Sequence, residues 1–279
     1  MKIGFVGQGY VGKNYADNFE KRGFKVVRYS IDGEYLDNRE ELKSCGVVFV
    51  AVPTPTRKSK SDSSIVASSL KLLAPDTIVV IKSTILPGTT KALQSKYKKL
   101  TVLHSPEFLT SKTASKDVEK PSRNILGIPS NSAKHKKAAK MVMKILPRAK
   151  FEMISTSRES EFIKYAVNTF YYSKVVYMNL LYDLAQKIGV KWENIKKSLA
   201  ADPWTGPMHI EPVHKTGRGA GGHCLIKDYA AFKKFFGEKA PEAEGDLELL
   251  SIIEKRNIDL LTSTKKDLEV LKKVYGRDF

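Results

Sequence analysis

The chain has 279 residues and a formal net charge of +18, from 48 lysines and arginines against 30 aspartates and glutamates. Hydrophobic residues make up 42% of it and the mean hydropathy is −0.30, which excludes general disorder and predicts a folded chain of about two domains. No stretch has the roughly 20 apolar residues of a transmembrane helix, and no secretory signal pattern opens the chain. The positive charge favours anionic partners: nucleic acid, acidic membranes or phosphorylated metabolites.

The two cysteines, Cys45 and Cys224, are far apart in the sequence. Their spacing predicts neither a disulfide framework nor a metal site. Reduced thiols and the missing signal pattern together predict a cytoplasmic protein. Cys45 precedes an apolar strand, and we expect it to be an unreactive core residue.

The N-terminal segment has the pattern of a strand, a turn, a helix and a second strand. The apolar run Lys2–Val6 leads into the turn Gly7–Gly12, which is followed by the helical Lys13–Arg22 and the strand-like Phe24–Tyr29. A glycine turn at this place in a βαβ unit is typical of dinucleotide binding, the alternative being a purely structural turn.

Each glycine of the turn has its own expected part. Gly7 permits a tight turn, Gly9 lets the backbone approach a pyrophosphate, and Gly12 lets the helix pack closely on the strand. The N–H groups of the helix that follows the turn then face the phosphates.

Alternating strands and helices continue through the N-terminal half. Apolar, β-branched runs predict strands at Gly46–Val52, Thr77–Lys82, Leu100–His104 and Asn124–Ile128, with helices around Ser63–Leu73 and Thr89–Lys98. The pattern predicts an α/β fold with a Rossmann-like, doubly wound parallel sheet, in which ligands bind at the carboxyl ends of the strands. Thr84 and Glu107 follow two of these strands and become candidates by position, although Thr84 could simply cap a helix and Glu107 could be a solvated loop residue.

The second half is helical. Thr156–Ile188 contains neither proline nor glycine and predicts one helix of about 30 residues. We therefore expect a cofactor domain at 1–154 and an all-helical domain at 155–279, with a last helix at Ala243–Val274. A helix this long predicts a homodimer that forms through residues 156–188.

Two polar positions on the long helix are candidates for substrate contact. Lys164 and Asn168 are four residues apart, so both lie on one face. An ammonium and an amide both donate hydrogen bonds to an oxyanion. The alternative is a pair that faces solvent.

The segment Gly217–Asp228 predicts the centre of the chemistry. Its glycines suit a backbone that closes around a ligand, and Cys224 falls near the start of the helical Tyr229–Phe236, with Lys227 close by. Both features stabilise a thiolate, the form of cysteine that attacks carbonyl carbons. Asp228, one turn later, could order a water molecule or accept a proton, or could be a first-turn acid that favours the helix dipole.

Six segments carry a family resemblance. They read GQGYVG, VAVPTPT, STILPGTT, SPEFL, EFIKYAVNTF and GRGAGGHCLIKD in that order. The chain resembles the UDP-glucose/GDP-mannose 6-dehydrogenases from Met1 to about Asn257. These enzymes use NAD to oxidise the C6 alcohol of a nucleotide sugar to a carboxylate, so the resemblance implies that four-electron reaction here, through a thiohemiacetal and a thioester on Cys224.

The resemblance also implies roles for individual residues. The implied catalytic residues are Cys224 (nucleophile), Lys164 and Asn168 (oxyanion), and Asp228, Thr84 and Glu107 (water and reacting carbon). The implied substrate contacts are Glu107, Phe108, Leu109, Lys164, Asn168, Lys215, Gly219 and Gly221. The implied cofactor contacts are Gly7, Gly9, Tyr10, Val11, Gly12, Ser30, Val52, Pro53, Thr54, Ser83, Thr84 and Lys227.

The chain departs from the family pattern at several positions. Ser30 replaces the acid that binds the ribose hydroxyl, with Arg28 and Asp32 nearby, so we expect NAD while NADP stays open. Other differences are at Ser111, Trp204, Ala220 and Ile226. The family commonly continues into a third domain that binds the nucleotide, whereas this chain stops at Phe279. The nucleotide would then be held by basic residues of these two domains or by a partner subunit, or the substrate would carry a smaller anionic group, or the chain would have lost activity.

Two other functions remain open at this stage. One is a two-electron β-hydroxyacid-type dehydrogenase, which also pairs a Rossmann domain with a helical one but needs no cysteine. The other is a noncatalytic protein that binds anions or nucleic acid, for which the basic Lys134–Lys137 is the best sign. We expect a nucleotide sugar as partner and neither nucleic acid nor a membrane.

Overall fold

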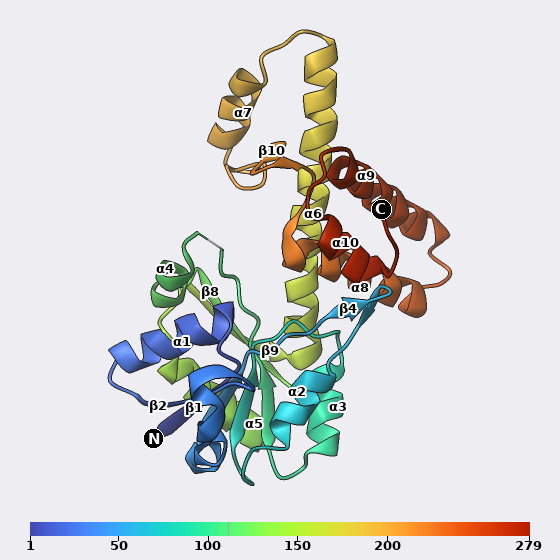
Figure 1. Ribbon diagram of the computed structural model, residues 1–279. Coiled ribbons are helices and arrows are strands. Elements are labelled where there is room, and N and C mark those ends of the chain that lie inside the picture. Colours follow the sequence, from blue (N-terminus) through green and yellow to red (C-terminus); the bar gives the residue numbers. More distant parts are fainter. Residues whose placement is uncertain (111) are drawn as a thin grey trace. The chain divides into compact units, whose positions relative to one another are not determined.

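A computed structural model describes residues 1–110 and 112–279 of the chain (Figure 1). Its contacts divide it into two units: Met1–Thr54 with Asp62–Lys164, and Pro55–Ser61 with Tyr165–Phe279. The division falls inside a long helix, and a short hairpin from the N-terminal half belongs to the second unit. Within the described residues, no helix combines the length and the apolar character that crossing a membrane requires.

The first unit contains a seven-stranded sheet (Figure 1). In sheet order its strands are β2 (Lys25–Tyr29), β1 (Lys2–Val6), β3 (Val47–Val50), β6 (Ile78–Ile81), β7 (Thr101–His104), β8 (Arg123–Ile128) and β9 (Phe151–Thr156). The first five of these are mutually parallel, which confirms the predicted fold class. The chain leaves β1 toward β2 on one side and reaches β3 on the other, so the switch point of the topology lies between β1 and β3.

One strand runs against the prediction of an all-parallel sheet. β8 is antiparallel to β7, through the pairing of His104 with Gly127. The connection between them carries α4 (Ala114–Glu119), and a six-residue helix spans only about 9 Å. That helix is too short to return the chain along the strand, so β8 starts near the carboxyl end of β7. β9 was not predicted because its residues alternate between exposed and partly exposed at the sheet edge.

Helices cover both faces of the sheet. They are α1 (Tyr10–Lys21), α2 (Ser64–Leu70), α3 (Thr89–Lys96), α4 and α5 (Ala133–Ile145), with short 3₁₀ segments at Gly33–Arg39 and Glu41–Ser44. Val47 and Phe49 of β3 face a core shared with α1, α4 and α5, while Val48 and Val50 face a core shared with α2 and α3. Successive strand residues point to opposite faces, so a strand buried on both sides reads as a continuous apolar run.

The long helix α6 (Ser157–Lys187) begins in the first unit, as the sequence predicts. Its start is a reciprocal capping box. The Thr156 N–H donates to Glu159 Oε2 at 2.7 Å, and the Glu159 N–H donates to Thr156 Oγ1 at 3.3 Å. The helix contains neither glycine nor proline, so it continues without a break into the second unit and is 31 residues long in total.

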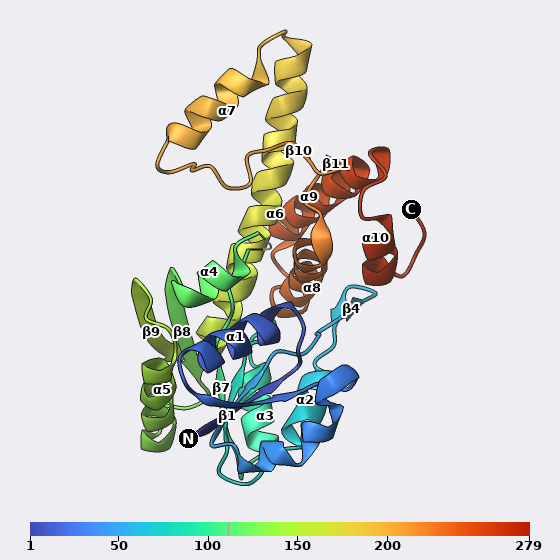
Figure 2. The ribbon, with the colours of Figure 1, turned by 60° about the vertical axis from the view of Figure 1, so that its left-hand side comes forward.

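The second unit is helical apart from two small hairpins. It contains β4 (Thr56–Arg57), β5 (Lys60–Ser61), the rest of α6, α7 (Trp192–Ala201), β10 (Val213–His214), β11 (Gly217–Arg218), α8 (Gly222–Lys239), α9 (Glu244–Ser263) and α10 (Leu268–Tyr275). Figure 2 shows α8, α9 and α10 beside one another, and Ile226, Leu261 and Leu271 form their shared core. Tyr172 of α6 stacks on Tyr229 of α8 with ring centroids 3.9 Å apart.

The helix predicted at Ala243–Val274 is two helices. α9 ends at Ser263 and α10 begins at Leu268, separated by a turn in which Lys265 and Asp267 have φ values of 53° and 55°. Neither residue is glycine or proline, so the break has no local sequence signal.

Lys82 is a buried cation that joins three elements of the first unit. It follows β6 directly and is 3% exposed. Its Nζ donates to Ser105 Oγ at 3.0 Å and to Tyr15 OH at 3.2 Å, and lies 4.2 Å from the centre of the Tyr15 ring. Burial lowers the pKa of Lys82 to about 7, although the charge of Glu107 acts in the opposite direction. No motif in the sequence marked this residue.

Lys82 should therefore make the stability of the fold depend on pH. In the unfolded chain its pKa returns to 10.5, so between about pH 7 and about pH 10 only the unfolded state keeps this proton, and stability rises with pH. We expect the free energy of unfolding of the wild type, minus that of Lys82→Met, to rise by up to about 1.4 kcal/mol per pH unit above pH 7. Urea unfolding of both proteins from about pH 6 to about pH 9 measures this, and a constant difference would contradict it.

Candidate active site

The glycine turn after β1 is shaped by close backbone contacts and leaves one open position. Gly7 has φ of +89°, and a Cβ there would lie 2.6 Å from the Ala51 carbonyl oxygen. A Cβ on Gly12 would lie 1.8 Å from the Gly7 carbonyl oxygen. A Cβ on Gly9 would meet no atom within 4 Å. Gly7 and Gly12 thus serve the packing of the turn, and Gly9 leaves space for a ligand to approach the backbone.

This turn fits the diphosphate of a dinucleotide. Gly9 caps α1 without a side-chain hydrogen bond, so the first N–H groups of the helix are available to an anion. The turn also lies at the switch point between β1 and β3, where doubly wound sheets bind their ligands. Tyr10 donates a hydrogen bond to the Thr110 carbonyl, and Val11 packs on the core below the turn.

The cation near the end of β2, Arg28, is already paired with two carboxylates. Arg28 is 8% exposed, and its Nη2 lies 2.6 Å from carboxylate oxygens of both Asp17 and Glu20. The predicted cofactor residue Ser30 donates to the backbone oxygen of Asp32, whose side chain is exposed. This end of the sheet therefore presents a hydroxyl and a carboxylate, the group that suits a ribose hydroxyl and repels a 2′-phosphate.

The segments after β3 and β6 are joined by one hydrogen bond. Ser83 Oγ donates to the Val52 carbonyl at 2.7 Å. Thr54 is buried, Thr84 is partly buried, and Pro53 lies exposed between Val52 and Thr54. These predicted cofactor residues thus share the carboxyl edge of the sheet with the glycine turn.

Glu107 and Lys164 form a buried ion pair in the first unit. Lys164 Nζ donates to Glu107 Oε1 at 3.0 Å and to the Glu107 backbone oxygen at 2.7 Å, with side chains 8% and 12% exposed. The second oxygen of Glu107 accepts the Leu109 N–H at 2.8 Å. Burial alone would raise the pKa of Glu107. Lys164 and the Leu109 N–H lower it by more than burial raises it, so the pKa of Glu107 lies below its usual value. The ring of Phe108 packs against the Arg123 guanidinium at 3.8 Å.

Asp228 and Asn168 form the corresponding pair in the second unit. Asp228 is 1% exposed; its Oδ2 accepts a hydrogen bond from Asn168 Nδ2 at 2.6 Å, and its Oδ1 lies 2.5 Å from Lys227 Nζ. Lys164 and Asn168 are one turn apart on α6, as predicted, and each is bonded to a different carboxylate.

Cys224 lies in the first turn of α8, two residues after the helix begins. It is exposed, and Asp228 follows one turn later. Cys45, in contrast, is 3% exposed, and burial raises the pKa of its thiol to about 11. The structure confirms Cys45 as a core residue and separates the two thiols by their surroundings.

The glycines before Cys224 pack against α9 and the turn after it. A Cβ on Gly217 would lie 2.4 Å from Thr264 Oγ1, and one on Gly219 would lie 2.9 Å from Asn257 Oδ1. The fully buried Asn257 accepts the Ala220 N–H at 2.6 Å and donates to the Ala220 carbonyl at 3.0 Å. Close packing is thus a physical reason for these glycines. Lys215, predicted to contact substrate, is exposed at the tip of the β10–β11 hairpin.

Three functional candidates escaped the sequence analysis. They are Asn257, Lys266 and Asp267, all of which contact the loop that leads to Cys224. A signal existed for Asn257 alone, because it is a polar residue on the apolar face of a helix. Ser111, named as a departure from the family pattern, lies outside the described residues.

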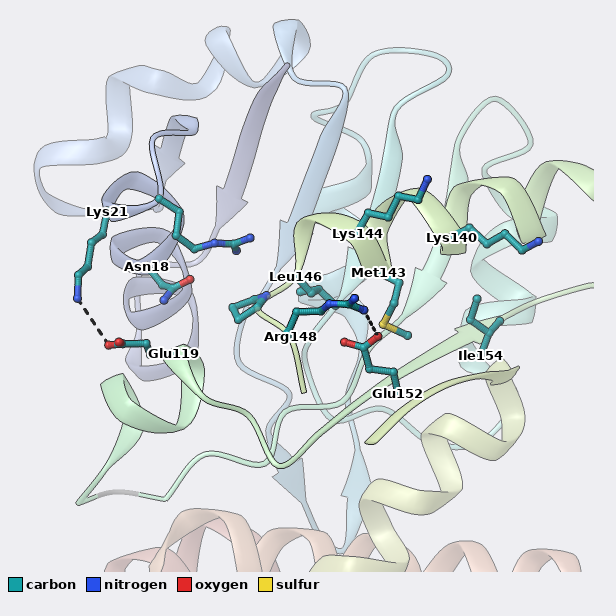
Figure 3. A pocket seen from close by; sticks show the side chains of 12 residues that line it. Asn18, Lys21, Glu119, Lys140, Met143, Lys144, Leu146, Arg148, Glu152 and Ile154 are labelled. Carbon is teal, nitrogen blue, oxygen red and sulfur yellow. Dashed lines mark hydrogen bonds and ion pairs between the residues drawn. The ribbon is translucent and has the colours of Figure 1, made fainter. Parts of the chain in front are cut away.

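A groove of about 880 Å³ lies elsewhere in the first unit (Figure 3). Its lining comes from the end of α1, from α4, from α5 and the loop after it, and from β9, and contains none of the predicted site residues. Two pairs of its charged side chains neutralise each other, Lys21 with Glu119 at 3.6 Å and Arg148 with Glu152 at 3.5 Å. The predicted chemistry therefore does not belong to this groove.

Two sequence profiles of one family match the chain. The NAD binding domain of the UDP-glucose/GDP-mannose dehydrogenase family matches residues 35–146, and the central domain of that family matches residues 158–258. The first match begins after the glycine turn Gly7–Gly12. The turn is therefore support for a dinucleotide-binding domain that is independent of the profile match.

Relatives and solved structures give the same family. UDP-glucose 6-dehydrogenase of Rickettsia bellii is 30% identical over 272 residues, which cover 83% of this chain and 62% of that protein. That of Rhizobium meliloti is 27% identical over 279 residues, covering 84% and 63%. This chain therefore spans under two thirds of their length.

Two solved structures share the fold. A UDP-glucose dehydrogenase from Pyrobaculum islandicum has a TM-score of 0.77 at 23% identity, covering 91% of this chain and 68% of that one. A 3-hydroxyisobutyrate dehydrogenase from Mycobacterium tuberculosis has a TM-score of 0.72 at 15% identity, covering 99% and 98%. The two profile matches extend over most of both units, and the chain belongs to the UDP-glucose/GDP-mannose dehydrogenase family.

Proposed function

We propose that this chain oxidises the C6 alcohol of a nucleotide sugar to a carboxylate, with NAD as the electron acceptor and Cys224 as the nucleophile. The observation that carries the proposal is the place of Cys224. It is an exposed thiol in the first turn of α8, one turn before a buried Asp228 that Asn168 and Lys227 hold. Membership of the family supplies the reaction class.

The first unit would hold the cofactor. The N–H groups of the Gly7–Gly12 turn would bind its diphosphate, and Ser30 with Asp32 would bind the adenine ribose. Val52, Pro53, Thr54 and Ser83 line the same edge of the sheet. When bound there, NAD would supply the hydride acceptor for each of the two oxidations.

Cys224 would retain the intermediate between the oxidations. Its thiolate adds to the aldehyde carbon, a C–S bond forms, and the electron pair of the carbonyl moves to oxygen. Lys164 Nζ and Asn168 Nδ2 donate hydrogen bonds to that oxyanion. Loss of the second hydride re-forms the carbonyl and leaves a thioester on Cys224.

Water completes the reaction. Its oxygen bonds to the thioester carbon, the C–S bond breaks, and Cys224 leaves as a thiolate while the proton passes to a carboxylate. We assign the ordering of this water to Asp228, Thr84 and Glu107. The low pKa of Glu107 keeps it an anion that accepts hydrogen bonds.

A second candidate function is a two-electron β-hydroxyacid-type oxidation. The likeness to 3-hydroxyisobutyrate dehydrogenase, which covers 98% of that chain, favours it at the level of fold. That reaction yields one NADH per substrate and has no step for Cys224, whereas the four-electron reaction yields two.

We also propose a homodimer that forms through α6. Five exposed apolar side chains recur along this helix at spacings of 7, 3, 4 and 4 residues: Phe170, Tyr177, Leu180, Leu184 and Ile188, the last just beyond its end. This spacing places them on one stripe. A second copy of the helix would bury that stripe.

We place this dehydrogenase in the cytoplasm. Its anionic partner would be a phosphorylated sugar, and neither nucleic acid nor a membrane.

Replacing the nucleophile should separate the two oxidations. We expect Cys224→Ser to lose uronate formation by about a thousandfold or more, because a serine hydroxyl does not capture the aldehyde. An NADH assay with mass spectrometry of the products, run over UDP- and GDP-sugars, measures this. Cys45→Ala is the matched control and should keep two NADH per sugar. Undiminished uronate formation by Cys224→Ser would overturn the mechanism.

The cofactor preference should follow from the paired Arg28. Because Asp17 and Glu20 neutralise its guanidinium, Arg28 does not compensate a 2′-phosphate, and we expect NAD to bind at least about tenfold more tightly than NADP. Ser30→Asp should widen the gap by adding a carboxylate. Calorimetric titration with both cofactors tests this, and equal affinities would contradict the assignment.

The proposed dimer should depend on the apolar stripe. We expect the double variant Leu180→Glu and Leu184→Glu to be monomeric at micromolar concentration, since it places charges where the stripe would be buried. Light scattering after size-exclusion chromatography gives the mass, to be compared with 31.2 kDa for one chain. Gln186→Glu, on the opposite face of α6, should stay dimeric. A monomeric wild type would rule the dimer out.

A further inference from the structure

The turn between α9 and α10 is the strongest feature of the second unit that the proposed function leaves without a role. It comprises Thr264–Asp267, and it lies beyond the matched central domain, which ends at residue 258. Lys265 and Asp267 adopt left-handed φ values there, a conformation that costs free energy in residues other than glycine and persists where the surrounding contacts determine it.

We call Gly217–Gly222, the segment that leads to Cys224, the cysteine loop. The charged side chains of the Thr264–Asp267 turn form hydrogen bonds with its backbone. Lys266 is 7% exposed, and its Nζ donates to the Gly219 carbonyl at 2.9 Å and to the Gly217 carbonyl at 3.5 Å. Asp267 Oδ2 accepts the Gly222 N–H at 2.7 Å. Hydrogen bonds in which one partner is charged are stronger than neutral ones, so these bonds hold the loop backbone firmly.

Asp267 caps the helix that carries Cys224. Gly222 is the first residue of α8, and Gly221 before it has no side chain to cap the helix. Asp267 satisfies one of the N–H groups that every helix start leaves open, from a segment 45 residues away. Cys224 is in this same turn of helix, and a thiolate there is stabilised by the helix N-terminus only while the turn is formed.

The side chains of the turn pack closely against Gly221. A Cβ on Gly221 would lie 2.2 Å from Asp267 Oδ2 and 2.7 Å from Lys266 Cε. Lys266 is also a buried cation whose pKa burial lowers, so its ammonium depends on the loop carbonyls that it bonds.

We propose that Lys266 and Asp267 are positioning residues that hold the first turn of α8 formed, and with it keep the Cys224 thiol in its reactive state. The role in catalysis rests on the proposed function, because it takes Cys224 to be the nucleophile. The effect on the thiol itself does not, since it can be measured without substrate.

The experiment is the pH dependence of Cys224 alkylation by iodoacetamide, followed by peptide mass spectrometry. Asp267→Ala and Asp267→Asn both lose the carboxylate charge, but only Asn keeps an acceptor for the Gly222 N–H. We expect the alkylation midpoint of the Ala variant to lie about 0.5 pH units or more above that of the Asn variant. Cys45, buried in the other unit, reports any general unfolding by becoming reactive.

Lys266 provides an independent pair of variants. Lys266→Met removes the donors and keeps an apolar stem, whereas Lys266→Arg keeps donors. We expect the Met variant to raise the midpoint and to lower kcat about tenfold or more without changing KM for NAD, and the Arg variant to restore part of both. Equal midpoints within both pairs would overturn the proposal.

The two hypotheses fail in distinguishable ways. If Cys224→Ser keeps full uronate formation, the proposed function fails, while the alkylation midpoints still test the positioning role of Lys266 and Asp267. If the midpoints are equal within both pairs although Cys224→Ser is inactive, the positioning role fails and the proposed function stands. Should Lys266→Met not fold, the partly exposed Asp267 gives the decisive comparison.

Discussion

Each of the two units contains a buried carboxylate that must be paired. Glu107 and Asp228 are almost inaccessible to water, and an ionised carboxylate in that position is stable only if its oxygens accept hydrogen bonds from charged or polar donors. Helix α6 supplies a donor to each, Lys164 to Glu107 and Asn168 to Asp228. The two donors are one turn apart, so the capping box and the unbroken sequence of α6 fix their spacing.

Much of the fold could be predicted because burial on both faces leaves a clear record in the sequence. Val47–Val50 is apolar throughout, since alternate residues serve different cores. The orientation of β8 left no such record. It depends on how far the short helix α4 carries the chain, and apolar content does not encode that. β9 was missed for the opposite reason, because an edge strand with exposed side chains resembles a loop.

The sequence can propose site residues only where the pattern is local. Cys224 and Asp228 are such a prediction, because their chemistry and spacing fall within one helical turn. The contacts of Lys82, Lys266 and Asp267 left no such signal, because their partners are 23 to 67 positions away. Lys265 and Asp267, the left-handed residues that separate α9 from α10, are likewise neither glycine nor proline, so the sequence does not indicate that a helix ends there.

Glycine has two distinct uses in this chain, and the structure separates them. At Gly7, Gly12, Gly217, Gly219 and Gly221 a side chain would collide with neighbouring atoms, so these glycines let parts of the protein touch. At Gly9 a side chain would collide with nothing, and its absence leaves room beside the start of α1. A glycine-rich motif in a sequence therefore mixes positions that serve packing with positions that leave open space.

That separation changes how the segment before Cys224 should be understood. Its glycines allow α9 and the following turn to reach the backbone of the loop, and Asn257, Lys266 and Asp267 then bond to that backbone. These three residues hold the loop backbone from the protein side. The glycines of the loop are required because those contacts are so close.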